Sequence, residues 1–294
     1  MKRREMLRVT GAAMLGLATF PLAGLRAADD KKKKILYFTR SVGFQHSPVA
    51  RKGSELSYSE KLMIEEGRKY GVEVVCSKDG TIFDGDIDQF DCFAFYTCGD
   101  LCNPKSVDGA PPMTPAGKKK LLDAVAGGKG FVGFHSASDT FHSKGPANEN
   151  QTELDPYIAM LGGEFIVHGE QQKAKMKVAS RNLPGLEGLE DFDIVEEWYA
   201  LKNFAKDLHV ILVQETAGMR NDCYQRPSYP ATWARKHRQG RVFFTSLGHR
   251  EDVWTHPECQ KVILAGFNWA LGNVDADVTP NVEQVTPKAW QLKR

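Results

Sequence analysis

The sequence predicts an α/β protein with a doubly wound, mainly parallel sheet and extra strands in its second half. In the first half, short apolar runs alternate with segments of helical spacing, and this alternation is typical of a parallel sheet covered by helices. Runs such as residues 35–39 are almost continuously apolar, as expected for strands buried on both faces. In the second half the apolar runs are short and frequent, which predicts further strands.

The first half contains four expected strands and two expected helices. The strands are expected over residues 35–39, 72–76, 92–96 and 131–134. The first helix is expected over residues 57–69, because apolar residues recur with helical spacing and Gly71 suits the end of a helix. The second is expected to begin at Thr114 and Pro115, which suit the N-cap and first turn, and to extend to Val125.

The second half is expected to be richer in strands. These are predicted over residues 165–167, 173–178, 193–198, 209–213, 231–234 and 241–245, and the last two should form a hairpin around residues 238–240. A closing helix is expected over residues 257–271, followed by a Pro-containing tail over residues 273–294. The folded α/β domain is therefore predicted over residues 35–272, which is long enough to bury a large core.

The first 27 residues have the pattern of an export signal. Arg3 and Arg4 precede an apolar stretch, residues 11–25, that is too short and too rich in Gly and Ala to span a bilayer permanently. Paired arginines in this setting favour a Tat-type signal peptide cleaved after Ala27, with a Sec signal or an uncleaved anchor as alternatives. Residues 28–34 follow as a charged leader. We therefore expect a periplasmic or otherwise exported protein.

The composition restricts the partners of the chain. The formal net charge is +2 and basic and acidic residues are mixed, so nothing favours nucleic acid. Residues 28–294 contain no long apolar run, so no membrane span is expected after signal cleavage. The six cysteines show no CxxC pairing; disulfides are open to an exported protein, but small buried thiols explain most of them better. We expect a small-molecule partner, and a homo-oligomer stays open.

Five of the expected runs end in polar residues that suit catalysis. His46 follows the first strand, His135 the fourth, His168 the run at residues 165–167, Glu197 the run beginning at residue 193, and His249 the run beginning at residue 242. In open α/β sheets, ligands bind outside the carboxyl ends of the strands. Because histidines and a carboxylate suit metal binding or proton transfer, we expect these side chains to form one site.

Aromatic residues and a serine accompany this group. Trp198 and Tyr199 follow Glu197, and Trp254 follows His249; their rings are expected to hold a sugar ring, with His46 and Ser136 as further substrate-binding residues. Each residue alone also has a plain structural explanation, since a single histidine at a strand end is more often a hydrogen-bonded loop residue. The remaining histidines are expected to be structural or at the surface: His142, His209, His237 and His256.

Residues 133–137 have the layout of a nucleophile elbow, in which a sharp turn after a strand exposes one side chain above the sheet. The exposed position is His135, where an elbow enzyme carries serine or cysteine. A neutral imidazole can act as an acid, a base or a metal ligand, but it is a poor acyl acceptor for amide hydrolysis. The adjacent Ser136 has no identifiable base partner in the sequence, so histidine-centred chemistry is favoured over serine hydrolysis.

Four segments together resemble the ThuA-like (trehalose utilisation) family: residues 39–47, 133–137, 196–199 and 240–249, whose order and spacing match along residues 34–272. The resemblance implies a flavodoxin-like, class I glutamine amidotransferase-like fold without the amidotransferase cysteine, and a role in carbohydrate catabolism. It also places His46, His135, His168, Glu197 and His249 on the family's recurrent polar positions. The sequence departs from the family at Glu196, which is usually aspartate, and at residues 234–237, where Trp-x-His is frequent.

These observations predict an exported carbohydrate-processing protein, a lyase, hydrolase or isomerase that acts on a glycoside or keto-sugar. His135 is expected as the central acid or base, Glu197 as its carboxylate partner, and His168 and His249 as the rest of the catalytic group. Alternatively, His135, His168 and Glu197 bind a divalent metal such as Zn²⁺; no HxH or HExxH spacing decides between the two. A non-catalytic carbohydrate-binding or accessory protein with the same pocket is the competing hypothesis, and a glutamine amidotransferase conflicts with the absent elbow cysteine.

Overall fold

A computed structural model of the chain describes residues 32–293. The expected signal peptide, residues 1–27, and residues 28–31 of the expected leader lie outside the described residues. Within the described range, no helix combines the length and the apolar character needed to cross a membrane. All six cysteines are free thiols; Cys92, Cys98 and Cys259 are buried, as predicted for most of them, whereas Cys76, Cys102 and Cys223 are only partly buried.

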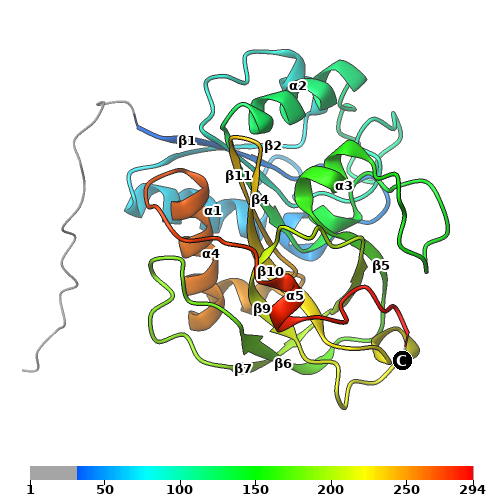
Figure 1. Cartoon of the computed structure of the whole chain (residues 1–294). Coiled ribbons are helices and arrows are strands. Elements are labelled where there is room, and N and C mark those ends of the chain that lie inside the picture. The colour runs from blue at the N-terminus through cyan, green and yellow to red at the C-terminus, as the bar shows by residue number, and fades with distance from the viewer. Residues whose placement is uncertain (1–31, 294) are drawn as a thin grey trace, which may run out of the picture. The chain divides into compact units, whose positions relative to one another are not determined.

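A nine-stranded mixed sheet forms the centre of the described residues, in the order β2-β1-β3-β4-β11-β10-β9-β6-β7 (Figure 1). The first five strands pair in parallel; they are β2 (Glu73–Ser77), β1 (Lys34–Phe38), β3 (Cys92–Phe95), β4 (Gly130–Phe134) and β11 (Gly240–Thr245). The order reverses between β1 and β3, which is the kind of switch point where doubly wound sheets bind ligands. This half confirms the predicted flavodoxin-like α/β fold.

The other half of the sheet is antiparallel. It consists of β10 (Tyr229–His237), β9 (His209–Gln214), β6 (Gln172–Val178) and β7 (Phe192–Glu196), and β10 forms the predicted hairpin with β11. A separate two-stranded antiparallel sheet pairs β5 (Glu164–His168) with β8 (Tyr199–Lys202). The extra strands predicted for the second half therefore extend the parallel sheet on one side.

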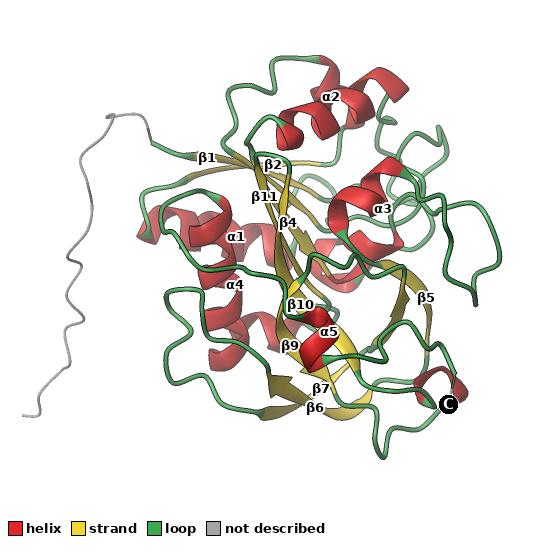
Figure 2. Ribbon diagram, in the orientation of Figure 1, coloured by secondary structure: helices red, strands yellow, loops and turns green. Residues whose placement is uncertain are grey.

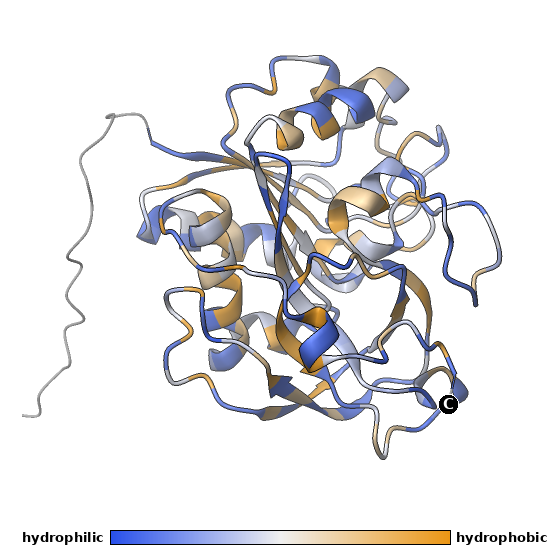
Figure 3. Ribbon diagram, in the orientation of Figure 1, coloured by the Kyte–Doolittle hydropathy of each residue, from blue (hydrophilic) through white to orange (hydrophobic). Residues whose placement is uncertain are grey.

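Helices cover both faces of the parallel half (Figure 2). Helices α1 (Tyr58–Lys69) and α4 (Pro257–Ala270) pack into one core, whereas α2 (Pro115–Ala126) and α3 (Pro156–Leu161) pack into the other. Along β1, Ile35 and Tyr37 belong to the first core and Leu36 and Phe38 to the second, because successive strand residues point to opposite faces. Figure 3 shows the hydrophobic residues along these strands and helices. Two buried faces explain why the strands are continuously apolar.

Three short elements are not expected from the sequence: α3, β8 and α5 (Val282–Val285). Helix α3 has six residues and α5 has four, which is too short for a recognisable helical period. Helix α5 lies in the segment 273–294 that we expected as a tail. Val282 and Ala289 of this segment are buried in the second core, and the Ala289 carbonyl accepts a hydrogen bond of 2.7 Å from Arg226. The segment therefore packs against the domain.

Gly240 begins β11 and lies against the end of α2. A Cβ atom added at this position would lie 2.0 Å from the backbone oxygen of Val125, which cannot rotate away. We expect Gly240→Ala to lower the free energy of unfolding by about 1–3 kcal/mol, the usual range for overpacking, as measured by chemical denaturation. Gly85→Ala is the matched control, because its Cβ would meet only the Ile82 oxygen at 3.4 Å. Equal losses in the two variants would contradict the prediction.

Candidate functional site

Four of the predicted residues form one group, which we call the His/Glu cluster: His46, His135, Glu197 and His249. One imidazole nitrogen or carboxylate oxygen from each lies within 4.8 Å of the others. His46 follows β1, His135 follows β4, His249 follows β11, and Glu197 lies between β7 and β8. The ends of three parallel strands and the β7–β8 turn therefore meet at one edge of the sheet.

The Glu197 carboxylate is the centre of the site. Its Oε2 lies 3.4 Å from His135 Nε2 and 3.0 Å from His249 Nδ1, and its Oε1 lies 3.4 Å from His168 Nδ1. Burial raises the pKa of Glu197, but the interactions with His135 and His249 outweigh burial and hold this pKa below its usual value. Glu197 is therefore ionised at neutral pH, and its charge faces three imidazole rings.

His135 lies on the sharp turn that the sequence predicts for an elbow. Its φ of 39° is in the left-handed region, which is uncommon for residues other than glycine. It is fully buried and begins the 3₁₀ helix His135–Asp139 directly after β4. Its Nδ1 lies 2.9 Å from the backbone oxygen of Ser246. Because a carbonyl oxygen can only accept, Nδ1 carries a hydrogen, and this contact fixes the orientation of the ring.

Two nitrogens of the cluster have no hydrogen-bond partner. His135 Nε2 and His249 Nδ1 are both buried without an aligned partner, although each lies close to Glu197 Oε2. With the hydrogen on Nδ1, a neutral His135 directs the lone pair of Nε2 towards an oxygen that is itself negatively charged. A buried polar atom in this situation requires an explanation. Either a proton on Nε2 or a cation between the facing atoms would remove the repulsion.

His46 closes the inner side of the cluster as a neutral imidazole. Its ring centroid lies 5.0 Å from that of His135 and 5.2 Å from that of His249, and its Nε2 lies 3.2 Å from the Tyr199 hydroxyl. Burial, and secondly the two neighbouring histidines, lower the pKa of His46 to about 2. His46 is therefore uncharged at neutral pH and does not compensate the charge of Glu197.

Glu196 ties two parts of the cluster together through their backbones. Its carboxylate is fully buried and accepts hydrogen bonds from the N–H of Glu197 at 2.8 Å and of Gly248 at 2.9 Å. Gly248, which precedes His249, has a φ of 120°, a conformation that glycine adopts readily. Burial raises the pKa of Glu196. The residue that departs from the family pattern thus joins the β7–β8 turn to the end of β11.

The other predicted catalytic and polar residues lie around the cluster. His168 ends β5, and its side chain is 44% exposed where it approaches Glu197 from the outside. It is not among the four clustered residues, so the group closest to a metal-binding arrangement contains His46 and His249 where we expected His168. Ser136 is buried, and its hydroxyl has no hydrogen-bond partner.

The three aromatic residues predicted to hold a sugar are buried. Trp198, Tyr199 and Trp254 are 0%, 3% and 5% exposed. Trp198 donates a hydrogen bond of 2.7 Å to the Gln172 oxygen, and Trp254 donates one of 2.9 Å to the Gly248 oxygen. Their rings pack in the protein interior around the cluster, and sugar binding by these three residues stays a prediction.

Two residues that the sequence analysis does not single out also contact the site. Gln171 Nε2 lies 3.0 Å from His249 Nε2, and Gln171 Oε1 accepts a hydrogen bond of 3.1 Å from Arg250. The Tyr96 hydroxyl donates a hydrogen bond of 3.0 Å to the Gly248 oxygen. Tyr96 ends an expected strand, and this position is a usable signal in the sequence. Gln171 lies in the short connection between β5 and β6, which has no such signal.

Comparison with known protein families matches the ThuA family, described as trehalose utilisation, over residues 34–270. The chain belongs to the ThuA family. This membership confirms the resemblance drawn from the sequence and suggests a carbohydrate-related role. Two solved structures of putative ThuA-like proteins, from Bacteroides uniformis and Parabacteroides merdae, are similar to the chain, with 14% and 16% identity and TM-scores of 0.57 and 0.55.

These matches cover 89% and 90% of this chain and 100% of the two solved ThuA-like chains. At such low identity they show the fold alone. A comparison with curated proteins finds no match. The chemistry of this ThuA chain therefore has to be argued from its own residues.

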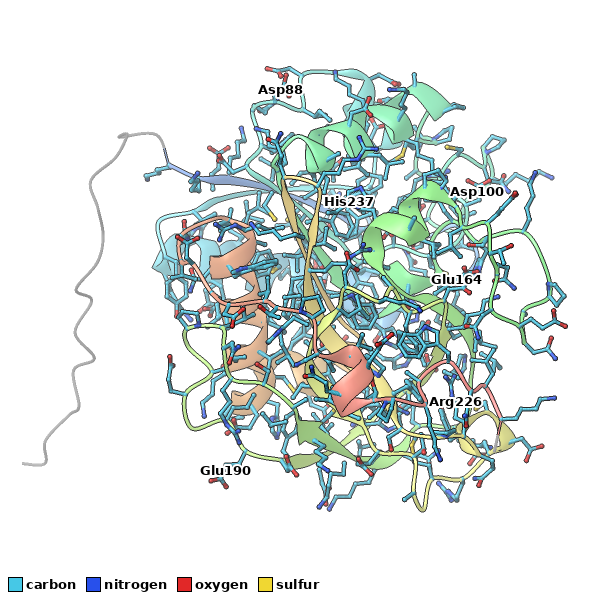
Figure 4. The ribbon with its side chains drawn as sticks, in the orientation of Figure 1. Asp88, Asp100, Glu164, Glu190, Arg226 and His237 are labelled. Carbon is cyan, nitrogen blue, oxygen red and sulfur yellow. The ribbon has the colours of Figure 1, made fainter. Side chains whose placement is uncertain are left out.

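The four histidines that we expected to be structural or at the surface lie outside the cluster. His209 lies 2.7 Å from both the Ser180 hydroxyl and the Thr279 oxygen. His237 (Figure 4) ends β10 at the hairpin and pairs with Gly240 at the start of β11, whereas His249 of the cluster follows the end of β11. His256 precedes α4. His142 is different, because it forms an ion pair on each side of its ring.

His142 connects the 3₁₀ helix of His135 to β5. Its Nε2 lies 2.7 Å from Asp139 Oδ1, and its Nδ1 lies 3.1 Å from Glu164 Oε1. Glu164 is at the start of β5 (Figure 4). The hydrogen bonds with Asp139 and then with Glu164 raise the pKa of His142 to about 9. A charged His142 at neutral pH therefore holds these two elements together.

We expect the ion pairs of His142 with Asp139 and Glu164 to raise the free energy of unfolding at neutral pH but not in alkaline solution. Because the pKa of His142 is raised to about 9, its contribution should be complete below about pH 6.5, the ordinary value for histidine, and should be lost as the pH rises through about 9. The side chain is 45% exposed, so we expect only about 1 kcal/mol.

The measurement is the difference in free energy of unfolding between the wild type and His142→Gln at several pH values. In this difference the titration of other groups cancels. The difference should shrink between pH 7 and pH 10, and a constant difference over this range would show that His142 is not held as a cation.

Proposed function

We propose that this ThuA chain is an exported carbohydrate-processing enzyme, a lyase, hydrolase or isomerase of a glycoside or keto-sugar, that reacts at the His/Glu cluster with a divalent cation such as Zn²⁺. The observation that carries the proposal is the pair of buried nitrogens, His135 Nε2 and His249 Nδ1, that face one carboxylate oxygen without hydrogen-bond partners. Family membership supports the carbohydrate-related part.

The donor set of the cluster fits a divalent transition metal. Three imidazoles and one carboxylate supply nitrogen and oxygen ligands of the kind that Zn²⁺ binds. Two ligands are already in the state that binding requires, since His46 is neutral and Glu197 is ionised. The Ser246 oxygen next to His135 Nδ1 is the type of outer contact that orients a histidine ligand. A bound cation would polarise a substrate oxygen or acidify a bound water.

The residues of the chain supply proton transfer and access. His168 and His249 are the more exposed imidazoles, at 44% and 16% of their side chains, whereas His135 is fully buried. A substrate therefore approaches from the side of His168 and His249. On that side His168, which contacts the Glu197 carboxylate, exchanges protons with the substrate, and the ionised Glu197 orients its imidazole.

Metal binding is tested first. Protein prepared without chelators should contain, or take up on titration with Zn²⁺, about one metal ion per chain, as measured by elemental analysis and calorimetry. His135→Ala and Glu197→Gln should each reduce the affinity at least tenfold, because each removes a ligand. His237→Gln, at the β10–β11 hairpin, is the control and should bind like the wild type.

If the wild-type protein neither contains metal nor binds Zn²⁺, Mn²⁺ or Ni²⁺, the proposal that the cluster binds a cation is contradicted. The unpaired nitrogens would then be explained by protonation, and the cluster would act as a proton-transfer site alone.

Turnover is tested separately. Wild-type protein is screened against trehalose, lactose and cellobiose and their oxidised keto forms, with and without added metal. On the substrate identified, His135→Ala should lower kcat because it removes a ligand of the cation, and His168→Ala should lower kcat about 10²–10⁴-fold, the usual contribution of a positioned acid or base. Full turnover by His135→Ala would exclude His135 from the reaction. Binding of sugar without turnover by the wild type would favour the competing hypothesis of a carbohydrate-binding accessory protein.

A further inference from the structure

We propose that Phe44 is the platform on which the substrate of this site stacks, and that the group it recognises is the C–H face of a neutral pyranose ring. The inference rests on the proposed function for the assignment of the ligand as a carbohydrate. It adds a recognition residue that lies outside the group predicted from the sequence.

Phe44 is an exposed aromatic ring in direct contact with the His/Glu cluster. It follows Gly43 in the loop after β1, and its side chain is 58% exposed. Its ring centroid lies 4.8 Å from that of His46, with the ring planes at 79°. His46 itself is only 2% exposed. Phe44 is therefore the outermost ring of a series of edge-to-face contacts that continues through His46 to His135.

The buried aromatic residues around the cluster leave this role to Phe44. The rings of Trp198, Tyr199 and Trp254 are each at most 5% exposed, so they present little surface to a ligand. The large exposed hydrophobic residues of the described chain are Phe44, Tyr70, Val107, Val167 and Val195. Among these, Phe44 is the aromatic residue that contacts the cluster.

Polar groups lie around the cluster and next to Phe44 in the chain. Beyond the cluster, the exposed His168 and Gln171 present nitrogen and amide atoms. Gln45, which follows Phe44 in the chain, lines a polar cavity of about 590 Å³. An apolar face surrounded by hydrogen-bonding groups matches a pyranose, which has an apolar C–H face and a rim of hydroxyls, and binding sites commonly combine such surfaces.

The charges of this cavity favour a neutral ligand. Its two basic residues are already paired, Arg51 with Glu60 at 2.7 Å and Lys78 with Asp108 at 3.5 Å. An anionic substrate would have to compete with these carboxylates. A neutral polyol can accept hydrogen bonds from the basic residues of these ion pairs and donate hydrogen bonds to their carboxylates, while the charges stay balanced.

The test measures sugar affinity in variants of one side chain. Trehalose, lactose and cellobiose are titrated into wild-type, Phe44→Ala, Phe44→Leu and Phe44→Tyr proteins and followed by calorimetry. Phe44→Ala should weaken the affinity about tenfold, since it removes the apolar surface that the ring buries against the sugar. Phe44→Tyr should stay within about twofold of the wild type because the ring is kept.

Phe44→Leu separates stacking from simple coverage of His46. Leucine keeps an apolar cover but has no flat face, so its affinity should fall close to that of Phe44→Ala. If Leu binds like the wild type, the flat ring is not the recognised feature and the inference is overturned. Tyr70→Ala is the matched control, because Tyr70 is also 58% exposed but ends α1 at the other edge of the sheet.

The outcome is independent of the proposed catalysis. If His135→Ala loses metal and turnover while Phe44→Ala keeps the wild-type affinity for sugar, the proposed function is supported and the role of Phe44 in binding is contradicted. If Phe44→Ala loses affinity for sugar while the wild type shows neither metal nor turnover, the role of Phe44 is supported and the protein binds carbohydrate without catalysis. Absence of binding of all three sugars by the wild type overturns the inference, whatever the metal content.

Discussion

An ionised carboxylate that is largely removed from water governs the arrangement of this site. Glu197 is 11% exposed as a side chain and faces nitrogens of His135, His249 and His168. A buried negative charge has to be compensated, and His46 does not contribute because burial keeps it neutral. No arginine or lysine pairs with Glu197 among the described residues. The compensating charge therefore has to come from a proton on one of the three facing imidazoles or from a cation bound among them. Imidazole is the side chain that can either release its proton or bind a metal near neutral pH.

The sheet brings these side chains together through backbone contacts as well as through packing. Glu196 accepts hydrogen bonds from the backbones of Glu197 and Gly248, and the Ser246 oxygen accepts from His135. The end of β11 thus contacts both the β7–β8 turn and the elbow after β4. Since the backbone donors and acceptors are fixed by strands β4 and β11, which pair in parallel, the positions of the imidazoles follow from the sheet. Substituting Glu196 would disturb two cluster residues without removing either.

The fold and the members of the cluster could be predicted from the sequence, but their depth and partners could not. Continuous apolar runs identified the parallel strands, and the rule that ligands bind at carboxyl ends identified His46, His135, Glu197 and His249. The sequence could not show that Trp198 and Tyr199 lie in the core, because an aromatic residue after a strand has the same pattern whether it faces the interior or the solvent. The sequence analysis also assigned His168 to the catalytic group and His46 to substrate binding, whereas His46 is buried within the cluster and His168 lies at its exposed side. Short elements such as α3 and β8 are held by tertiary contacts and have no period of their own.

The aromatic surroundings of the cluster bear on the choice between a proton and a cation. The rings of Tyr96 and Tyr199 lie 6.0 Å and 4.1 Å from that of His135, and burial raises the pKa of both phenols well above the ordinary value, so neither supplies a negative charge. A low-dielectric environment strengthens every interaction with Glu197. A shared divalent cation would be neutralised in part by Glu197 and satisfied by several ligands at once. The same burial that makes His46 a poor base keeps its lone pair available without the release of a proton. These surroundings agree with the divalent cation that we propose as the group that balances Glu197.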